Sequence, residues 1–221
     1  MHHKSILKEI FAVGTLVLFM ASATPASSAP IATLFGTGFT GAGVLQALGQ
    51  IDGNYIVLEN SGQPAEVVSQ PNGLWLPNDA NSQWIWQNAS ALPGNVTRTF
   101  RTTFALTGLD PASAVINGSW AVDNTGVDIR LNGSSTGISL PGSPFSNLDS
   151  FHPFTISSGF VTGLNTLDFI VTDLGAPGGF RAQLTGTANL AGNQVPEPGS
   201  LALFGFGLAG LRLLRRRRKA A

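Results

Sequence analysis

The sequence predicts an all-β fold, a β-sandwich or jelly roll, flanked by an N-terminal signal peptide and a C-terminal apolar helix. Segments rich in β-branched and aromatic residues recur between turn signals, and no helix-length amphipathic run separates them. An apolar stretch stands near each end of the chain. The residues between these stretches, 30–194, amount to about one domain and are enough to bury a core.

The first 29 residues have the pattern of a secretory signal peptide. Lys4 and Lys8 precede the apolar run 10–20, and small residues follow it up to Ala29. Charged, apolar and small-residue regions in this order are typical of such peptides. We therefore expect residues 1–29 to direct export and cleavage to fall between Ala23 and Ala29.

Six segments of the body have the composition and alternation of strands. They are residues 96–106, 113–122, 126–131, 151–156, 166–172 and 180–188. Turn signals punctuate this part of the chain, namely Leu109-Asp110-Pro111, Asn117-Gly118, Asp123-Asn124 and Asn132-Gly133. The earlier part, 30–72, is glycine-rich and less regular, and residues 51–58 are its best strand candidate.

The body carries few charges and no cysteine. Between residues 30 and 194 four arginines stand against ten acidic residues, which gives −6, and lysine is absent. An acidic body without lysine is a poor partner for nucleic acid and suits neutral polymers. Without cysteine the chain forms neither disulfides nor cysteine-ligated metal sites, so its stability outside the cell must come from core packing or a bound ion.

The tryptophans are the first candidates for a binding surface. Trp84-Ile85-Trp86 places two indoles on one face of a strand, and Trp75 stands among proline and glycine residues. Exposed indoles stack on sugar rings while nearby polar side chains bond the hydroxyls. The candidate glycan-binding residues are therefore Trp75, Trp84, Trp86, Asn124, Asn132 and Arg181. The alternative is that the tryptophans fill the core, which suits Trp120 best, whereas Trp75 is the best candidate for exposure.

A short acidic cluster raises the question of a metal. Asp123, Asn124 and Asp128 lie around one predicted turn. Carboxylate and amide oxygens at such spacing are the ligands that Ca²⁺ takes, so Asp123 and Asp128 are candidate calcium ligands. The alternative is turn chemistry alone, because Asp and Asn favour these bends without an ion. We predict no other cofactor.

The C-terminal residues 195–221 have three parts. A Pro-Glu-Pro motif at 195–200 is extended because its prolines prevent a helix, an apolar helix follows at 201–214, and a basic end at 215–219. The 15 residues from Ser200 to Leu214 make a helix about 22 Å long against a bilayer core of about 30 Å. This helix spans where the bilayer thins or the flanking arginines snorkel. The alternative is a basic tail that lies on a membrane surface.

This tail resembles the PEP-CTERM sorting signal of Gram-negative bacteria that make exopolysaccharide. The resemblance implies that an exosortase, a membrane-bound processing protease, acts at the motif formed by Val195, Pro196, Glu197, Pro198 and Gly199. It also implies a route: export, transient anchoring in the inner membrane by the C-terminal helix, and a final place at the cell surface or in the extracellular matrix.

The body resembles a galactose-binding-like jelly roll, a fold that also occurs as carbohydrate-binding modules. The matching runs are residues 100–104, 109–111, 120–124, 128–133 and 163–169. The resemblance implies a β-sandwich and a habit of binding glycans. It transfers no site residue, because the binding loops of these domains vary widely.

Three functions follow as hypotheses. The first is non-catalytic binding of exopolysaccharide or another glycan, the second is a structural matrix or adhesion role without a glycan ligand, and the third is glycoside hydrolysis. We expect no enzyme activity, because His152 is the single histidine of the body and neither a Gly-x-Ser-x-Gly nor a His-Glu-x-x-His motif is present. A glycosidase would need two opposed carboxylates, for which Asp123 and Asp168 are the first pair to consider.

Overall fold

The computed structural model describes residues 27–141 and 147–192. The signal peptide and the tail with its predicted helix lie outside the described residues. The body is all-β, with two short 3₁₀ helices, η1 (Leu58–Asn60) and η2 (Pro111–Ser113). Its strands are β1 (Ser28–Pro30), β2 (Ile51–Val57), β3 (Gln63–Val67), β4 (Ile85–Trp86), β5 (Val96–Ala105), β6 (Val115–Asp123), β7 (Thr125–Leu131), β8 (Ser134–Ser135), β9 (His152–Ile156), β10 (Leu164–Asp173) and β11 (Gly179–Asn189).

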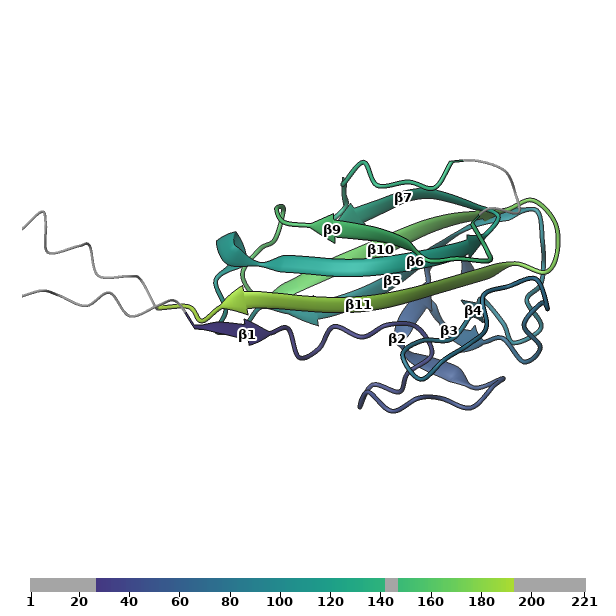
Figure 1. Cartoon of the computed structure of the whole chain (residues 1–221), viewed down its shortest axis with the longest axis horizontal. Coiled ribbons are helices and arrows are strands. Elements are labelled where there is room, and N and C mark those ends of the chain that lie inside the picture. Colours follow the sequence, from purple (N-terminus) through teal and green to yellow (C-terminus); the bar gives the residue numbers. More distant parts are fainter. Residues whose placement is uncertain (1–26, 142–146, 193–221) are drawn as a thin grey trace, which may run out of the picture. The chain divides into compact units, whose positions relative to one another are not determined.

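The strands form one antiparallel hydrogen-bonded path that folds into a sandwich (Figure 1). One layer consists of β7, β10 and β5, with the short β8 beside β7. The other consists of β9, β6 and β11, with β1 beside β11. The strands β2, β3 and β4 connect β5 to β11 and so join the two layers along one side. The predicted all-β sandwich is confirmed.

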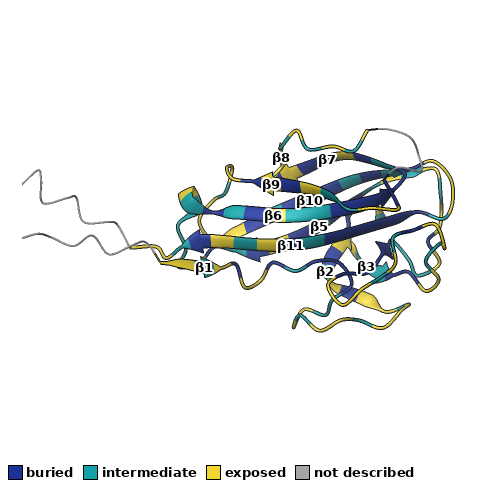
Figure 2. Cartoon of the chain, viewed as in Figure 1, coloured by how far each residue is buried: buried dark blue, intermediate teal, exposed yellow. Residues whose placement is uncertain are grey.

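The core lies between the two layers because side chains alternate along each strand. In β6, Ile116 and Trp120 are buried, whereas Asn117 between them is exposed. Phe169 of β10 and Phe180 of β11 meet from opposite layers with their ring centroids 4.8 Å apart. Buried positions run along the strands in Figure 2, as this alternation requires. Each such buried aromatic side chain contributes about 1.5–3 kcal/mol of hydrophobic stabilisation.

All six strand segments predicted for the second half of the body are present, as β5, β6, β7, β9, β10 and β11, with ends shifted by a few residues. One predicted turn is wrong. Asn117-Gly118 lies inside β6, where Gly118 pairs with Leu184 and Phe154 on the neighbouring strands. A Cβ at Gly118 would lie 2.4 Å from the Phe154 ring, so the glycine provides space in the core and does not mark a turn.

Two other turn signals are confirmed. The bend at Asp123-Asn124 separates β6 from β7, and Asn132-Gly133 separates β7 from β8. Asn132 has φ 51° and Gly133 has φ 80°, which is the left-handed backbone that Asn and Gly tolerate best. Among the described residues there is no helix of the length and apolarity that membrane crossing requires.

Candidate functional site

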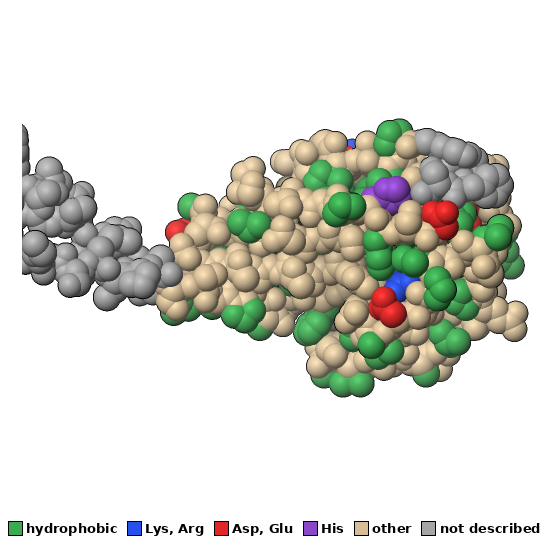
Figure 3. Space-filling view, in the orientation of Figure 1, with side chains coloured by type: hydrophobic (Ala, Val, Ile, Leu, Met, Phe, Trp, Pro, Cys, Tyr) green, Lys and Arg blue, Asp and Glu red, His purple; other side chains and the backbone are tan. Residues whose placement is uncertain are grey.

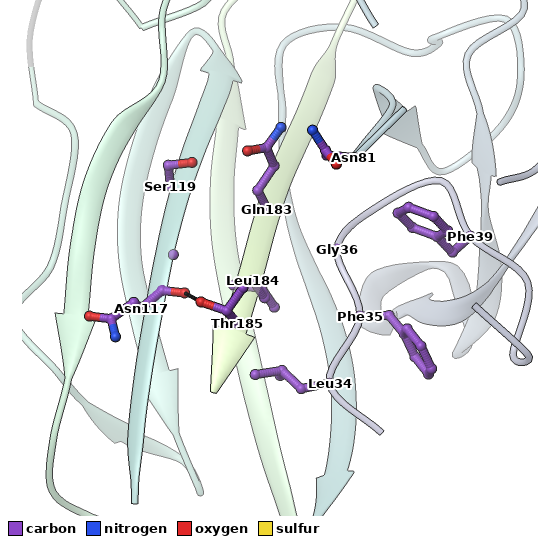
Figure 4. A pocket seen from close by; sticks show the side chains of 11 residues that line it. Leu34, Phe35, Gly36, Phe39, Asn81, Asn117, Ser119, Gln183, Leu184 and Thr185 are labelled. Carbon is purple, nitrogen blue, oxygen red and sulfur yellow. Dashed lines mark hydrogen bonds between the residues drawn. The ribbon is translucent and has the colours of Figure 1, made fainter. Parts of the chain in front are cut away.

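A groove of about 470 Å³ lies on the outer face of the layer formed by β6 and β11. Its floor has two rows of polar side chains from neighbouring strands. Asn117 on β6 is paired in register with Thr185 on β11, and Ser119 is paired with Gln183. Because their β6 neighbours Ile116 and Trp120 point into the core, alternation turns Asn117 and Ser119 outward. Figure 4 shows these four side chains on adjacent strands.

One side of the groove is formed by the segment 34–39, which runs beside β11. Thr37 fixes it, since its backbone N–H donates to the carbonyl of Ala182 at 2.9 Å and its Oγ1 donates to the carbonyl of Gln83 at 2.6 Å. Phe35 and Phe39 from this segment line the groove and are half-buried (Figure 4). The groove therefore has a polar floor and an aromatic side.

Asp52 fixes the backbone at Gly38, the residue directly before Phe39, through a hydrogen bond. The buried Asp52 accepts a hydrogen bond from the Gly38 N–H at 2.6 Å and another from the Asn54 N–H at 2.8 Å. Gly38 has φ 86°, a conformation that favours glycine. Burial raises the pKa of Asp52 to about 7, although hydrogen bonds from the backbone of Gly38, Asn54 and Tyr55 oppose the shift.

Asn81 closes one side of the groove, and the buried Arg181 holds its loop. The guanidinium of Arg181 donates to the carbonyl of Leu76 at 3.2 Å, to the carbonyl of Pro77, and through Nε to Ser82 Oγ at 2.8 Å. Its carbon Cζ lies 4.8 Å from the centroid of the Phe151 ring. Sequence reasoning placed Arg181 among the glycan ligands, but all these contacts are internal and the side chain is fully buried.

The groove is uncharged along its lining. None of its lining residues is acidic or basic, and three of them, Asn81, Asn117 and Gln183, carry side-chain amides. Asn117 Oδ1 accepts from Thr155 Oγ1 at 2.9 Å, while its Nδ2 makes no hydrogen bond to any described residue. In Figure 3 most charged side chains of this face gather to the right of the view, and the surface over the left part of β6 and β11 carries no acidic or basic side chain apart from one acidic group at its far left end. Amides, hydroxyls and aromatic rings without charge are the groups that neutral sugars contact.

The expected exposure of Trp75 is wrong. Trp75 is 3% exposed, its ring lies 4.5 Å from that of Trp84, and its Nε1 donates to Asp123 Oδ2 at 2.8 Å. Trp84 and Trp86 are fully buried as well, the latter against Phe100. These indoles fill the core and its margin, so their faces are occupied by protein. The exposed aromatic platform proposed from the sequence is not formed by these residues.

The predicted asparagines have internal hydrogen bonds in two separate places. Asn124 is buried, and its Oδ1 accepts from the backbone N–H of Leu174 at 2.7 Å. Asn132 donates to Asn165 Oδ1 at 2.9 Å and accepts from the N–H of Thr166 at 3.0 Å. The structure thus brings Asn124 near Trp75 and Asp123, and it places Asn132 in another turn.

The two candidate calcium ligands make separate sets of contacts. Asp123 accepts from Trp75 and from Asn124 Nδ2, whereas Asp128 contacts Arg130 at 3.1 Å and accepts from Ser135 Oγ at 2.9 Å. Within residues 27–141 and 147–192 no group of three or more His, Asp or Glu side chains is placed to hold a metal ion. The shared calcium site stays a prediction that these contacts do not support.

Sequence reasoning missed the groove itself. Its floor residues Asn117, Ser119, Gln183 and Thr185 are the outward members of strands whose inward members were recognised as core. Alternation in 113–122 and 180–188 was therefore a usable signal for these positions. Phe35 and Phe39 had no such signal, because the glycine-rich segment around them has no period.

One family match falls in the tail. Residues 194–219 match the PEP-CTERM protein-sorting motif. The chain carries a PEP-CTERM sorting signal. A PEP-CTERM protein is exported, anchored in a membrane and then processed, and an exosortase is the processing enzyme that this signal implies. The motif residues Val195 to Gly199 lie outside the described residues. No curated protein sequence matches the chain significantly.

Several solved structures share a partial likeness with this chain. A cyclase from Fischerella sp. TAU has 12% identity and a TM-score of 0.44, over 75% of this chain and 99% of the cyclase. The CBM36-1 domain of a multidomain xylanase from the hindgut metagenome of Trinervitermes trinervoides has 14% identity and a TM-score of 0.31, over 62% and 97% of the two chains. A β-glucosidase from Kluyveromyces marxianus in complex with glucose has 13% identity and a TM-score of 0.29, over 70% and 23%. At TM-scores below 0.5 these likenesses establish neither a shared fold nor a shared ligand.

Proposed function

We propose that this exported protein binds neutral stretches of extracellular polysaccharide, without catalysis, in the groove on β6 and β11. The observation that carries the proposal is the uncharged lining, in which amides and hydroxyls form the floor and Phe35 and Phe39 form one side. Each sugar hydroxyl both donates and accepts, as do side-chain amides and hydroxyls, while the carbon faces of sugars pack on aromatic rings. The PEP-CTERM signal supports a place at the cell surface or in the matrix, where such polymers are found.

The charge of the body supports a neutral ligand. The ten acidic and four basic residues between 30 and 194 give −6, which repels polymers rich in uronic acid or sulfate. A non-catalytic role is supported by the same lining, because hydrolysis of a glycosidic bond needs a pair of carboxylates and the groove lining provides none. The two carboxylates considered from the sequence, Asp123 and Asp168, come from strands in different layers. Asp123 is on β6, whereas Asp168 is on β10 and forms two hydrogen bonds with Arg101 on β5.

The groove proposal can be tested by affinity electrophoresis of the full chain in gels that contain single neutral or acidic polysaccharides. We expect retardation by at least one neutral polymer. Asn117→Ala and Gln183→Ala should each weaken it about tenfold, which corresponds to roughly 1.4 kcal/mol for a lost pair of hydrogen bonds. Thr103→Ala, an exposed threonine on β5 in the other layer, is the matched control and should bind as the parent does. Equal retardation of all three variants would exclude the groove.

A structural matrix role without a glycan ligand is the second candidate. It is favoured by the loop that precedes and enters β2, in which Val44, Leu45, Leu48 and Ile51 are exposed. Neighbouring exposed apolar side chains are a common basis for association between proteins. Sedimentation of the full chain over a range of concentrations, compared with a Leu48→Ser variant, would detect self-association through this loop.

A further inference from the structure

A second cavity, of about 330 Å³, lies at the end of β6 where the chain turns toward β7. We call it the Asp123 pocket. Its lining includes Asn72, Leu74, Asp123, Asn124, Leu148 and Leu174. Four separate segments of the chain contribute these residues, and the nearest groove residue on β6, Ser119, is four positions before Asp123. Both face outward from the same strand, about 13 Å apart.

Asp123 is held in one orientation inside this pocket. Its Oδ2 accepts from Trp75 Nε1 at 2.8 Å, and its Oδ1 accepts from Asn124 Nδ2. Trp75 is itself packed against Trp84. Each carboxylate oxygen has a second lone pair beyond the one these donors occupy, so the carboxylate can still accept from a ligand.

The negative charge of Asp123 has no positive partner in the described body. Its four arginines make other contacts: Arg98 with Gln87, Arg101 with Asp168, Arg130 with Asp128 and Arg181 with Asp79. Asp123 is 5% exposed. Burial raises its pKa to about 6; the hydrogen bond from Trp75 opposes the shift, and the charge of Asp173 adds to it. At neutral pH the pocket therefore contains an ionised, poorly solvated carboxylate.

Two exposed leucines line the same pocket. Leu74 is 65% exposed and Leu174 is 57% exposed. Their backbones are fixed by pocket amides, because the Leu74 N–H donates to Asn72 Oδ1 at 3.0 Å and the Leu174 N–H donates to Asn124 Oδ1 at 2.7 Å. These hydrogen bonds keep the two leucine side chains at the surface. Their exposure to water is unfavourable, and a ligand that covered them would bury this apolar area.

We propose that the Asp123 pocket binds an organic ammonium group whose carbon body packs on Leu74 and Leu174. An ammonium has three N–H donors for the Asp123 carboxylate and the nearby amide oxygens, and it replaces the missing counter-charge. A calcium ion fits less well, since it needs six to eight oxygens and both Asp123 oxygens already face N–H donors.

This inference deepens the proposed function and partly depends on it. The groove and the pocket are separated along β6, because Ala121, which lies between Ser119 and Asp123 on the same face, is fully buried beside Arg181. A branch or a second segment of the same polysaccharide would bring a sugar near Asp123. An amino sugar at that point has the charge and the apolar ring face that the pocket requires. The ammonium of a lysine side chain or of a free alkylamine has the same chemistry, and the experiment must separate these sources.

The test is calorimetric titration of the full chain in nonionic detergent with a glucosamine oligomer, the N-acetylated oligomer of equal length, and butylamine. We expect the glucosamine oligomer to bind at least tenfold more tightly than its N-acetylated form. In Asp123→Asn, whose amide oxygen can still accept from Trp75, this preference should disappear. Asp149→Asn removes the same charge from an exposed position and should keep the preference. Butylamine binding as tight as that of the glucosamine oligomer would show that the sugar is not required.

Equal binding of the two oligomers, or an unchanged preference in Asp123→Asn, would overturn the proposal. If Asp123→Asn does not fold, Leu74→Ser and Leu174→Ser should each weaken butylamine binding severalfold. A failure of the groove proposal alone gives a different result. In that case Asn117→Ala would bind neutral polymers as the parent does, and butylamine binding would remain intact. As pH falls from 7 to 5, protonation of Asp123 should weaken butylamine binding about tenfold. Burial also raises the pKa of the neighbouring Asp173, while Trp75 and Asn124 do not titrate.

Discussion

Nη2 of the fully buried Arg181 lies 2.9 Å from Oδ2 of Asp79, whose side chain is 44% exposed. The pair is therefore unequal, with one charge in the core and the other at the surface. Burial lowers the pKa of Arg181, and the charge of Asp79 opposes this shift. Burial would raise the pKa of Asp79, but the N–H of Asn81 and the charge of Arg181 outweigh it and hold that pKa below its usual value.

Because Arg181 is buried and Asp79 is partly exposed, replacing each of them should lower the free energy of unfolding by a different amount. Arg181→Met should lower the free energy of unfolding by about 3 kcal/mol, because two carbonyls and Ser82 lose a charged donor inside the protein. Asp79→Asn should cost less than about 1 kcal/mol, since the carboxylate is partly solvated. Urea denaturation followed by tryptophan fluorescence measures both, and equal losses would contradict the assignment of Arg181 as the main contributor.

The buried Asp52 predicts how stability changes with pH. Its pKa of about 7 in the folded protein exceeds the ordinary value of 3.8, so the folded state binds the proton more tightly than the unfolded state does. The free energy of unfolding should therefore fall as pH rises from about 4 to about 7, by on the order of 4 kcal/mol, and level off above. Asp52→Asn should reduce this slope and leave the smaller contribution of Asp123, whose pKa is raised to about 6, even if the absolute stability of the variant is lower. A stability that rises over this interval would contradict the prediction.

Gly126 predicts an overpacking defect. A Cβ at this position would lie 2.3 Å from Cη2 of Trp120, which is buried against Phe169. Gly126→Ala should therefore lower the thermal midpoint through a cost of about 1–3 kcal/mol. Gly73→Ala is the matched control, because nothing lies within 4 Å of its added Cβ and its φ is not in the left-handed region. Similar midpoints for the two variants would show that Trp120 moves easily.

The sorting signal predicts a processing defect that leaves the body unchanged. Replacing Pro196, Glu197 and Pro198 with alanine should leave the full-length protein in the membrane fraction of the producing cells. The mass of the secreted or surface-bound parent, measured by mass spectrometry, should show that the tail is shorter. A normally processed triple variant would show that residues outside this motif direct the cleavage.

The sequence predicted the sandwich well where the signal was local. In β5 the β-branched and aromatic residues between Val96 and Ala105 are enough to specify a strand, and their alternation separates Phe100 and Phe104 from the outer face. The turn predicted at Asn117-Gly118 was wrong, because a dipeptide that favours turns also suits a strand that needs space beside Phe154. Local composition does not distinguish these two uses of glycine.

The candidate site depends on contacts that local sequence does not reveal. Trp75 is held in its buried position by a hydrogen bond to Asp123, which lies 48 positions later in the chain. The aromatic wall of the groove depends on Thr37, whose Oγ1 accepts from the N–H of Ala182, 145 positions away. Such partners are determined by topology, so a local pattern of proline, glycine and tryptophan could suggest a surface but could not show which surface forms.

The pairing of Ser28 with Asn189 has a mechanical consequence. The described body begins and ends at the same place, so a load applied through the tail enters the body at the end of β11. A polymer held at Gln183 and Thr185 would pull on the same strand only a few residues away. Tension between anchor and polymer would then run along the end of β11 from Thr185 to Asn189, where β11 is paired with β6 at Thr185 to Thr187 and with β1 at Thr187 to Asn189. Those hydrogen bonds would be loaded together in shear, so the groove would resist force without passing it through the rest of the sandwich.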